Sequence, residues 1–431
     1  MMQTPPEAAL QFDIGCTDDS LQRMVELFAL HGDIYRVYVP ARKTHTYVIH
    51  HPDDVKRVLV SNHRNYTKGL GFDRIRILLG NGIIGSEGDV WTRHRYMMQP
   101  MFHRRCVAEF AQMIAAANQR LLERWDGFAS RGEPVNVTDE MSDLALDVVL
   151  RAVFGGDLDC MTGRLGGNPF AVLSRETTRD LRFAYKFRSL TKVVAELIEH
   201  RHREKGEHFD YLSMLLAARD RETGAGLSDR ELIDEIMTLI VAGHETTASG
   251  LNWTWYLLSQ DLRVEAMLST EASAAPEGPH VSLTSVGQLT YTRHIIDEAL
   301  RLYPPVWLLS RRMICPDVLS GYELPAGTNV LLPLYLLHRH PRYWKCPDVF
   351  WPERFAAEQE SEHPRYCYMP FAAGPRHCIG ETFALLEMQM HLHLVARRFR
   401  LVYLRDSPPE LEAQINLRTR HPVHMRLERR G

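Results

Sequence analysis

The sequence predicts a mainly α protein with small β-sheets. Helical periodicity continues almost without interruption from Asp89 to about Arg301, which is about half of the 431-residue chain. Alternating apolar and polar residues before this stretch, and strand-like pieces after it, indicate sheets on either side of it. The chain exceeds the roughly 250–300 residues that one core usually supports, so its length requires either two domains or one large domain.

The expected elements follow in order along the chain. Strands are predicted at residues 34–39 and 46–49, and an amphipathic segment opens after them at Pro52. Residues 69–88 contain several glycines between patterned segments, and we interpret them as a functional surface loop. The remaining predictions are helices at 105–125, 138–154, 189–203, 229–259 and 380–399, a strand at 329–334, and a strand pair around Leu401 and Met425.

Composition and charge narrow the function classes. A chain with 45% hydrophobic and 24% charged residues is globular, and its net charge of -3 gives no reason to expect a nucleic-acid partner. The N-terminus lacks a signal-peptide pattern, and no apolar run reaches the ~18 residues of a membrane span. The nearest candidate, residues 236–258, is interrupted by His244 and Glu245. We therefore expect a cytoplasmic protein without a transmembrane segment.

The seven cysteines are odd in number and scattered, and no two of them form a CxxC pair. This pattern argues against a disulfide framework and against a structural zinc site. We expect most of them to be small buried apolar residues. The positions are 16, 106, 160, 315, 346, 367 and 378.

The predicted helix at 229–259 departs from helix propensity in the stretch LIVAGHETTASG. Gly243 costs about 1 kcal/mol in a helix interior, and the β-branched Thr246 and Thr247 are mildly unfavourable there. Beside the acid–hydroxyl pair Glu245-Thr246, such a departure can open the helix and hold a water or small ligand, and so supply protons to something bound against the helix. The alternative is a packing notch, in which small residues let another helix approach.

A second stretch, EALRLYPP, places Glu298 and Arg301 three residues apart, so they share one helix face and can pair. Such a pair is usually a surface feature of little energetic consequence. A buried version needs a second partner, and Arg354 in PRYWKCPDVFWPERF can supply it if the network is fully hydrogen-bonded.

The stretch FAAGPRHCIG places Cys378 in a constrained turn. Gly374 and Pro375 impose the turn, and the helix expected from about Gly380 would aim unpaired N–H groups toward the sulfur and stabilise a thiolate. A thiolate beside Arg376 can act as a nucleophile, a zinc ligand or an axial ligand of haem iron. The zinc candidates His363, Cys367 and His377 fit no common spacing, and the haem interpretation needs only one protein ligand.

Together these stretches resemble the cytochrome P450 family. Its haem-ligand loop is matched from Phe371 to Gly380, its oxygen-activation helix from Ala242 to Thr247, and its Glu-x-x-Arg pair at Glu298. The stretches Pro352-Glu353-Arg354-Phe355 and Trp91-x-x-x-Arg95 are similar to two further family motifs. The resemblance implies the cytochrome P450 fold as one domain over residues 1–431, with a small β-rich lobe near the N-terminus and a large helical body.

The resemblance also implies roles for individual residues. Haem b (iron protoporphyrin IX) would be the cofactor, with Cys378 as its thiolate ligand and Phe371 packed near the sulfur. The haem propionates would be bound by Trp91, Arg95, Arg312 and Arg376. On the long helix, Glu245 and Thr246 would deliver protons to iron-bound dioxygen and Gly243 would give room for it. The group Glu298, Arg301 and Arg354 would be structural and support haem insertion.

In one region the chain departs from the family. Between Phe154 and Leu197 it is shorter than the family commonly is in the helices over the substrate, so no lid contacts are transferred. Family substrate regions map to mostly apolar positions, which predict an apolar substrate with a polar anchor at Asn416. The same residues can equally be ordinary core. They are Phe72, Ile75, Val241, Ala242, Val306, Trp307, Leu308, Leu309, Ile415 and Asn416.

The activity that the resemblance implies is a monooxygenase that hydroxylates or epoxidises a small, mostly apolar organic molecule with O2 and two external electrons. The electrons would come from a ferredoxin or flavodoxin with its reductase, docked on the basic residues Arg93, Arg104, Arg105 and Arg376. The alternatives are a peroxide-using or isomerising haem-thiolate enzyme, a haem-binding protein without turnover, and a cysteine hydrolase. Retention of Glu245-Thr246 favours the O2 route.

Overall fold

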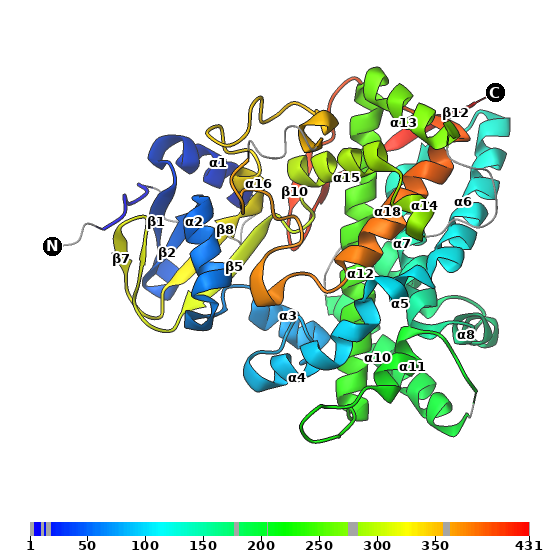
Figure 1. Cartoon of the computed structure of the whole chain (residues 1–431), viewed down its shortest axis with the longest axis horizontal. Coiled ribbons are helices and arrows are strands. Elements are labelled where there is room, and N and C mark those ends of the chain that lie inside the picture. Colours follow the sequence, from blue (N-terminus) through cyan, green and yellow to red (C-terminus); the bar gives the residue numbers. More distant parts are fainter. Residues whose placement is uncertain are drawn as a thin grey trace. The chain divides into compact units, whose positions relative to one another are not determined.

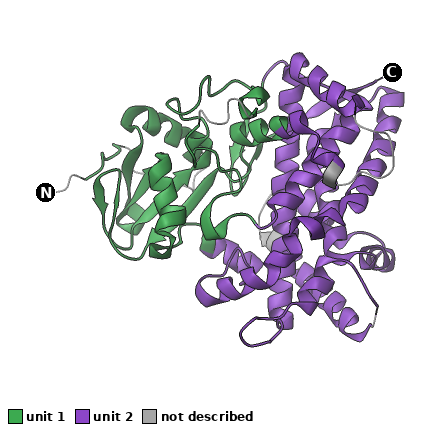
Figure 2. Cartoon of the chain, viewed as in Figure 1, with its two compact units in different colours: residues 1–72, 294–378, 408–421 green, residues 73–293, 379–407, 422–431 purple. Residues whose placement is uncertain are grey.

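The computed structural model describes residues 4–9, 13, 19–175, 181–204, 206–274, 283–356 and 363–430. These residues form two compact units that interleave along the sequence (Figure 2). Unit 1 consists of residues 1–72, 294–378 and 408–421, and unit 2 of residues 73–293, 379–407 and 422–431. Whether they form one domain stays a prediction. Among the described residues, none of the helices combines the length and the apolar character needed to cross a bilayer.

Unit 1 is built on a five-stranded sheet with the strand order β1-β2-β8-β5-β3. The parallel pair β2–β8 joins an N-terminal hairpin to later strands, so residues far apart in sequence become neighbours. Apolar side chains cover both faces of the sheet, as alternation in the strands requires. The strands of this sheet are β1 (Ile34–Val39), β2 (Thr44–Ile49), β3 (Tyr66–Lys68), β5 (Leu308–Met313) and β8 (Asn329–Pro333). Two separate two-stranded sheets consist of β6 (Asp317–Leu319) with β7 (Tyr322–Leu324), and of β10 (Leu411–Ala413) with β11 (Leu417–Thr419).

The helices of unit 1 are α1 (Ser20–His31), α2 (Pro52–Lys56), α16 (Leu334–Leu337) and most of α15 (Thr290–Leu302). A short π-helical turn follows α2 at Arg57–Ser61. The strand predicted at 329–334 ends one residue early, because Leu334 begins α16. The predicted strands near the N-terminus and the opening of a helix at Pro52 are confirmed.

Unit 2 is a helical body in which α12 packs along α7 and also contacts α18 (Figure 1). A three-stranded sheet of order β4-β12-β9 accompanies the helices. Leu401 of β9 pairs with Leu427 of β12, which confirms the predicted strand pair. The helices are α3 (Phe72–Leu79), α4 (Gly88–Met98), α5 (Arg104–Ala108), α6 (Ala111–Arg131), α7 (Val137–Phe154), α8 (Asp157–Leu165), α9 (Val172–Arg175), α10 (Leu181–Arg203), α11 (Tyr211–Ala217), α12 (Asp229–Gln260), α13 (Leu262–Ala274), α14 (Leu283–Val286) and α18 (Glu381–Ala396); the strands are β4 (Val135–Asn136), β9 (Phe399–Tyr403) and β12 (His424–Arg429).

Four sequence predictions in unit 2 differ from the structure in their boundaries. The helix predicted at 189–203 is the later part of α10, and the helix predicted at 380–399 ends at Ala396, because Phe399 begins β9. The helix predicted at 105–125 is divided into α5 and α6, and the division lets the buried Phe110 pack on the rings of Tyr211 and Phe383. Residues 69–88 are not only loop, because Phe72, Ile75 and Leu79 have helical spacing and α3 forms there.

Candidate active site

In unit 1, the loop that carries Cys378 is fixed by its backbone. Gly374 has a φ of +74°, and a Cβ atom on it would overlap the carbonyl oxygen of Leu59 in the π-helical turn. A 3-10 turn follows at Gly374–Arg376, and the Cys378 N–H donates to the Phe371 carbonyl over 2.9 Å. The loop is therefore closed on itself and presents an exposed Cys378 at its end.

The other described cysteines differ from the sequence expectation. Only Cys367 among them is buried, whereas Cys160, Cys315 and Cys346 are exposed. Scattered spacing predicts that cysteines stay free but carries no information on burial, which long-range packing decides. Cys16 lies outside the described residues.

The pair Glu298 and Arg301 lies in α15 and is joined by Arg354 in a fully buried network. Arg301 contacts both Glu298 carboxylate oxygens, at 2.7 and 2.9 Å, and Arg354 Nε donates to Oε1 over 3.0 Å. The side-chain exposures of Glu298, Arg301 and Arg354 are 0%, 0% and 1%. Backbone carbonyls of His338 and Pro347 accept the remaining Arg301 donors, so the desolvated charges are compensated by hydrogen bonds.

Two neighbouring arginines of β5 lie on opposite faces of the strand. Arg311 is buried and donates to the Ser310 carbonyl over 2.8 Å, whereas Arg312 is exposed opposite Asn329 of β8. The Arg312 guanidinium makes no hydrogen bond or ion pair to any described residue. Arg376 is half-buried in the 3-10 turn before Cys378. Unit 1 thus presents Arg312 as a cation available to an anionic group.

In unit 2, the relay pair lies on a continuous α12. The Thr246 hydroxyl donates to the carbonyl of Ala242, four residues earlier, over 2.6 Å. Val241, Ala242, Glu245 and Thr246 are half-buried and form one stripe of the helix. The break in the helix that the sequence suggested is therefore absent, and the hydroxyl instead adds a bond to a carbonyl within the helix.

Gly243 occupies a packing notch. A Cβ atom on it would lie 2.9 Å from Cγ2 of Val149 in α7, so its missing side chain makes room for that helix. The adjacent His244 is buried on the same helix pair, with its Nε2 2.9 Å from the Ser142 hydroxyl. Room for dioxygen at Gly243, which the resemblance implies, stays a prediction; the contact seen in the structure is the packing of Gly243 against α7.

On α4, Trp91 and Arg95 are one turn apart and both half-buried. Sequence reasoning missed their neighbour His94, whose ring is 1% exposed and lies 2.6 Å from Glu235 and 3.2 Å from Glu231. Burial opposes its charge, but the hydrogen bonds and charges of the two carboxylates raise the pKa of His94. The available signal was two carboxylates one helical turn apart at the start of α12, Glu231 of the capping box and Glu235.

Arg93 is not part of a free basic face. Its guanidinium donates to Glu231 over 2.6 Å and to the Gly226 carbonyl over 2.7 Å, so it ties α4 to the start of α12. Arg104 and Arg105 of α5 are exposed, as a docking face requires. Arg93 is therefore removed from the basic residues expected to dock a redox partner, which leaves Arg104, Arg105 and Arg376.

The predicted substrate residues divide into half-buried positions, one core residue and one exposed residue. Phe72 and Ile75 are half-buried on one side of α3, and Val306, Leu308 and Leu309 are half-buried around the start of β5. Trp307 is 3% exposed within the apolar core of unit 1, and its indole N–H donates to the Gln414 carbonyl over 2.8 Å. Its assignment to the substrate was therefore wrong.

The turn between β10 and β11 holds the last two candidates. Ile415 is 64% exposed, which is unusual for a large apolar side chain, and Asn416 beside it is half-buried. The carbonyl of Asn416 accepts a hydrogen bond from the Gln414 N–H over 3.2 Å, which shapes the turn.

Comparison with known proteins gives one consistent result. The family model for cytochrome P450 matches residues 7–166 and 167–427. Cyclooctatin synthase of Streptomyces melanosporofaciens is 32% identical over 412 residues, 92% of this chain and 88% of that protein. Cyclooctat-9-en-7-ol 5-monooxygenase of the same organism is 34% identical over 388 residues, covering 86% and 83%. The crystal structure of a cytochrome P450DA heme domain has a TM-score of 0.89 at 26% identity, covering 100% of this chain and 99% of that one.

Proposed function

Because the chain belongs to the cytochrome P450 family, we propose that Cys378 supplies the thiolate ligand of its haem iron. The protein is a haem-thiolate monooxygenase whose cofactor is haem b with a cysteine axial ligand. One observation carries the assignment to Cys378. It is the exposed thiol at the end of a loop whose shape is fixed by Gly374.

The residues present fit a haem with two propionates. Arg312 is exposed without a partner among the described residues, and Arg376 is two residues before the thiol. Trp91 and Arg95 share one side of α4 and offer further donors. An anionic group with two carboxylates needs several donors of this kind, which supports the assignment of these four residues to propionate binding.

We assign proton delivery to Glu245 and Thr246. Haem b with a thiolate ligand supplies an electron-rich iron that favours cleavage of the O–O bond. The Thr246 hydroxyl donates a 2.6 Å hydrogen bond to the Ala242 carbonyl. When the hydroxyl turns away from the helix and donates to another acceptor instead, its proton can be transferred to that acceptor. Glu245 is half-buried beside Thr246 and can return a proton to its Oγ1.

Labelled dioxygen tests the monooxygenase route. With surrogate electron donors and isotope-labelled O2, we expect one labelled oxygen atom in the product and none when the label is in water. Product formed only when peroxide replaces O2 and the electron donors would favour a peroxygenase instead.

The substrate that we propose is an apolar cyclic hydrocarbon or its mono-alcohol. The half-buried Phe72, Ile75, Val306 and Leu308 are apolar, and Asn416 at the β10–β11 turn offers one polar anchor. The name of the relative cyclooctat-9-en-7-ol 5-monooxygenase identifies a substrate of this class for that protein. Spin-state titrations with terpenoids, steroids and fatty acids should give a response to the first class. A response only to a carrier-bound amino acid would exclude this proposal.

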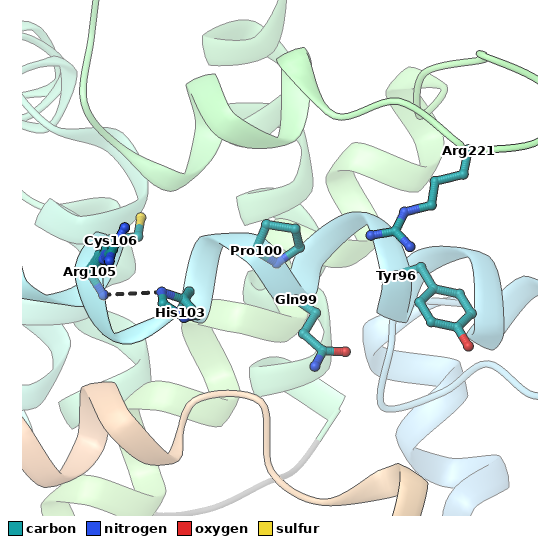
Figure 3. A pocket seen from close by; sticks show the side chains of 7 residues that line it. All are labelled: Tyr96, Gln99, Pro100, His103, Arg105, Cys106 and Arg221. Carbon is teal, nitrogen blue, oxygen red and sulfur yellow. Dashed lines mark hydrogen bonds between the residues drawn. The ribbon is translucent and has the colours of Figure 1, made fainter.

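We further propose that an acidic ferredoxin or flavodoxin docks over α5. A pocket of about 590 Å³ lies at the exposed junction of α4 and α5 (Figure 3). Arg105 and Arg221 bring positive charge to it, and the Arg221 guanidinium lies 6.0 Å from the centre of the Tyr96 ring. An acidic side chain of the partner fits this lining. The lining residues are Tyr96, Gln99, Pro100, His103, Arg105, Cys106 and Arg221.

Charge reversal tests the docking site. Arg104→Glu combined with Arg105→Glu should lower the second-order rate of haem reduction at least about tenfold at low salt, and added salt should shrink the difference. Arg164→Glu, an exposed arginine of α8, is the control and should leave the rate unchanged. Equal rates of haem reduction in the double variant and in the control would exclude this docking site.

A further inference from the structure

Four potential metal ligands gather at the end of α10 in unit 2, and none of them has a role in the site described above. Asp157 begins α8, His200 lies in the last turn of α10, and Glu204 follows that helix. One ligand atom from each of these three lies within 4.8 Å of the other two. His208 is the fourth, because its Nε2 lies 3.4 Å from Glu204 Oε2.

The spacing of these atoms is close to that of a tetrahedral metal site. His200 Nε2 is 3.6 Å from Glu204 Oε2, and the same oxygen is 3.4 Å from His208 Nε2. Bonds of about 2.0–2.1 Å in a tetrahedral zinc site place neighbouring ligand atoms roughly 3.3–3.4 Å apart. Glu204 Oε2 is therefore spaced from each of the two imidazole nitrogens as two ligands of one ion are spaced.

His208 has a nitrogen that contacts Glu204 Oε2 at 3.4 Å without a hydrogen bond of its own. Its Nε2 is shielded from solvent and makes no hydrogen bond to a described residue, which is unfavourable for a polar atom. A Cβ atom on Gly206 would lie only 2.7 Å from this nitrogen, so glycine is what allows the ring to fold back toward Glu204. A metal bond would satisfy the nitrogen.

Buried groups hold Asp157 in position. The guanidinium of Arg201, with a side chain 3% exposed, donates to Asp157 Oδ2 over 2.6 Å and to Asp210 Oδ2 over 2.8 Å. Because Asp210 balances the charge of Arg201, Asp157 and Glu204 together leave two negative charges for a divalent cation. Support of a ligand by such an outer hydrogen bond is typical of metal sites.

We propose that Asp157, His200, Glu204 and His208 form a binding site for a divalent transition metal, best suited to Zn²⁺. Two imidazoles with two carboxylates match the ligand preference of zinc better than that of calcium or magnesium, which take oxygen ligands. His200 and Glu204 are 56% and 41% exposed, so an ion can reach them from solvent. The bound ion joins α8, α10 and the segment after α10.

The test uses the purified full-length holoprotein without a histidine tag. After chelation and addition of Zn²⁺, elemental analysis should give one zinc per haem iron, and calorimetry a Kd below about 10 µM at pH 7.5. Zinc should also raise the Tm by about 2–4 °C.

Variants show whether these residues hold the ion. His200→Ala and Glu204→Gln should each lower zinc affinity at least about tenfold, and His208→Ala should lower it by a similar factor. His202→Gln is the matched control, because His202 is an exposed histidine of the same helix that pairs with Asp229 at 3.1 Å. Absence of stoichiometric zinc in the wild type, or equal affinity in the control and the three variants, would overturn the proposal. The haem spectrum is read in parallel and should not change with zinc.

Discussion

Two glycines show how differently the candidate residues of unit 1 and those of unit 2 are held. In unit 1, a side chain on Gly374 would meet a backbone carbonyl, that of Leu59, and the residue has a left-handed φ of +74°. In unit 2, a side chain on Gly243 would meet only a methyl group of Val149, 2.9 Å away. A backbone carbonyl cannot move without its chain, whereas a valine side chain can shift.

The difference teaches which part of the site depends on residue identity. The Cys378 loop owes its shape to backbone conformation, so single substitutions should change the position of the thiol. The relay pair on α12 lies on a regular helix, whose shape does not depend on any one side chain. In the relay that we propose, the chemistry depends instead on the Thr246 hydroxyl and on Glu245.

The largest effect is expected from the buried network that supports unit 1. Glu298→Gln removes the negative charge shared by two buried arginines, Arg301 and Arg354, and should cost about 3–5 kcal/mol of unfolding free energy. Urea unfolding followed by fluorescence measures this cost, with Glu323→Gln, an exposed residue of β7, as control. A loss below about 1 kcal/mol would mean that the network is not a stabilising element.

Gly374→Ala should have the next largest effect. Left-handed backbone costs a non-glycine residue about 1–2 kcal/mol, and the overlap with Leu59 adds to this. We expect a total of more than about 3 kcal/mol and a lower haem content. Gly321→Ala separates the two causes, because Gly321 has a φ of +81° with no neighbouring atom within 4 Å. Equal losses in the two variants would refute the close approach as the cause.

Thr246→Ala should reduce function rather than stability. Loss of the hydroxyl should lower product formed per electron consumed at least about tenfold, because protons are no longer delivered. Thr254→Ala removes the same kind of bond, 2.7 Å to the Gly250 carbonyl, and should leave this ratio unchanged. Thr246→Ser should restore most of the function. Normal coupling in Thr246→Ala would exclude the relay.

The smallest effect is expected for Gly243→Ala. Alanine gains about 1 kcal/mol of helix propensity, and this offsets the shift of Val149 that the new methyl group requires. The unfolding free energy should therefore change by less than about 1 kcal/mol, and Val149→Ala in the same chain should remove any remaining cost. A loss above about 3 kcal/mol would show that the notch between α7 and α12 is rigid.

Local patterns predicted the helical body, the strands around residues 34–49 and the pairing of Glu298 with Arg301. These features depend on periodicity and on spacing within one element, which a sequence displays directly. The position of Arg354 beside Glu298 and the exposure of Cys378 depend on contacts between distant segments. Charge balance suggested Arg354 as a candidate partner and the family resemblance strengthened it, whereas no local pattern indicated the exposure of Cys378.

The errors have the same physical origin. Trp307 was assigned to the substrate because a family substrate region maps to its stretch, but packing within unit 1 places its side chain in the core, where it bonds to the Gln414 carbonyl. Arg93 was assigned to a basic face, yet Glu231, 138 residues away, binds it. The helical spacing within α3 was present in the sequence and was outweighed by its flanking glycines.

The central claim is that Cys378 provides the thiolate of the haem site, and the reduced, carbon-monoxide-bound absorption spectrum tests it most directly. We predict that the purified wild-type protein shows the Soret band of thiolate-ligated haem, and that Cys378→Ser loses this band while keeping its helical content by circular dichroism. The same band in Cys378→Ser, or a wild-type protein that contains haem but never shows the band, would contradict the claim.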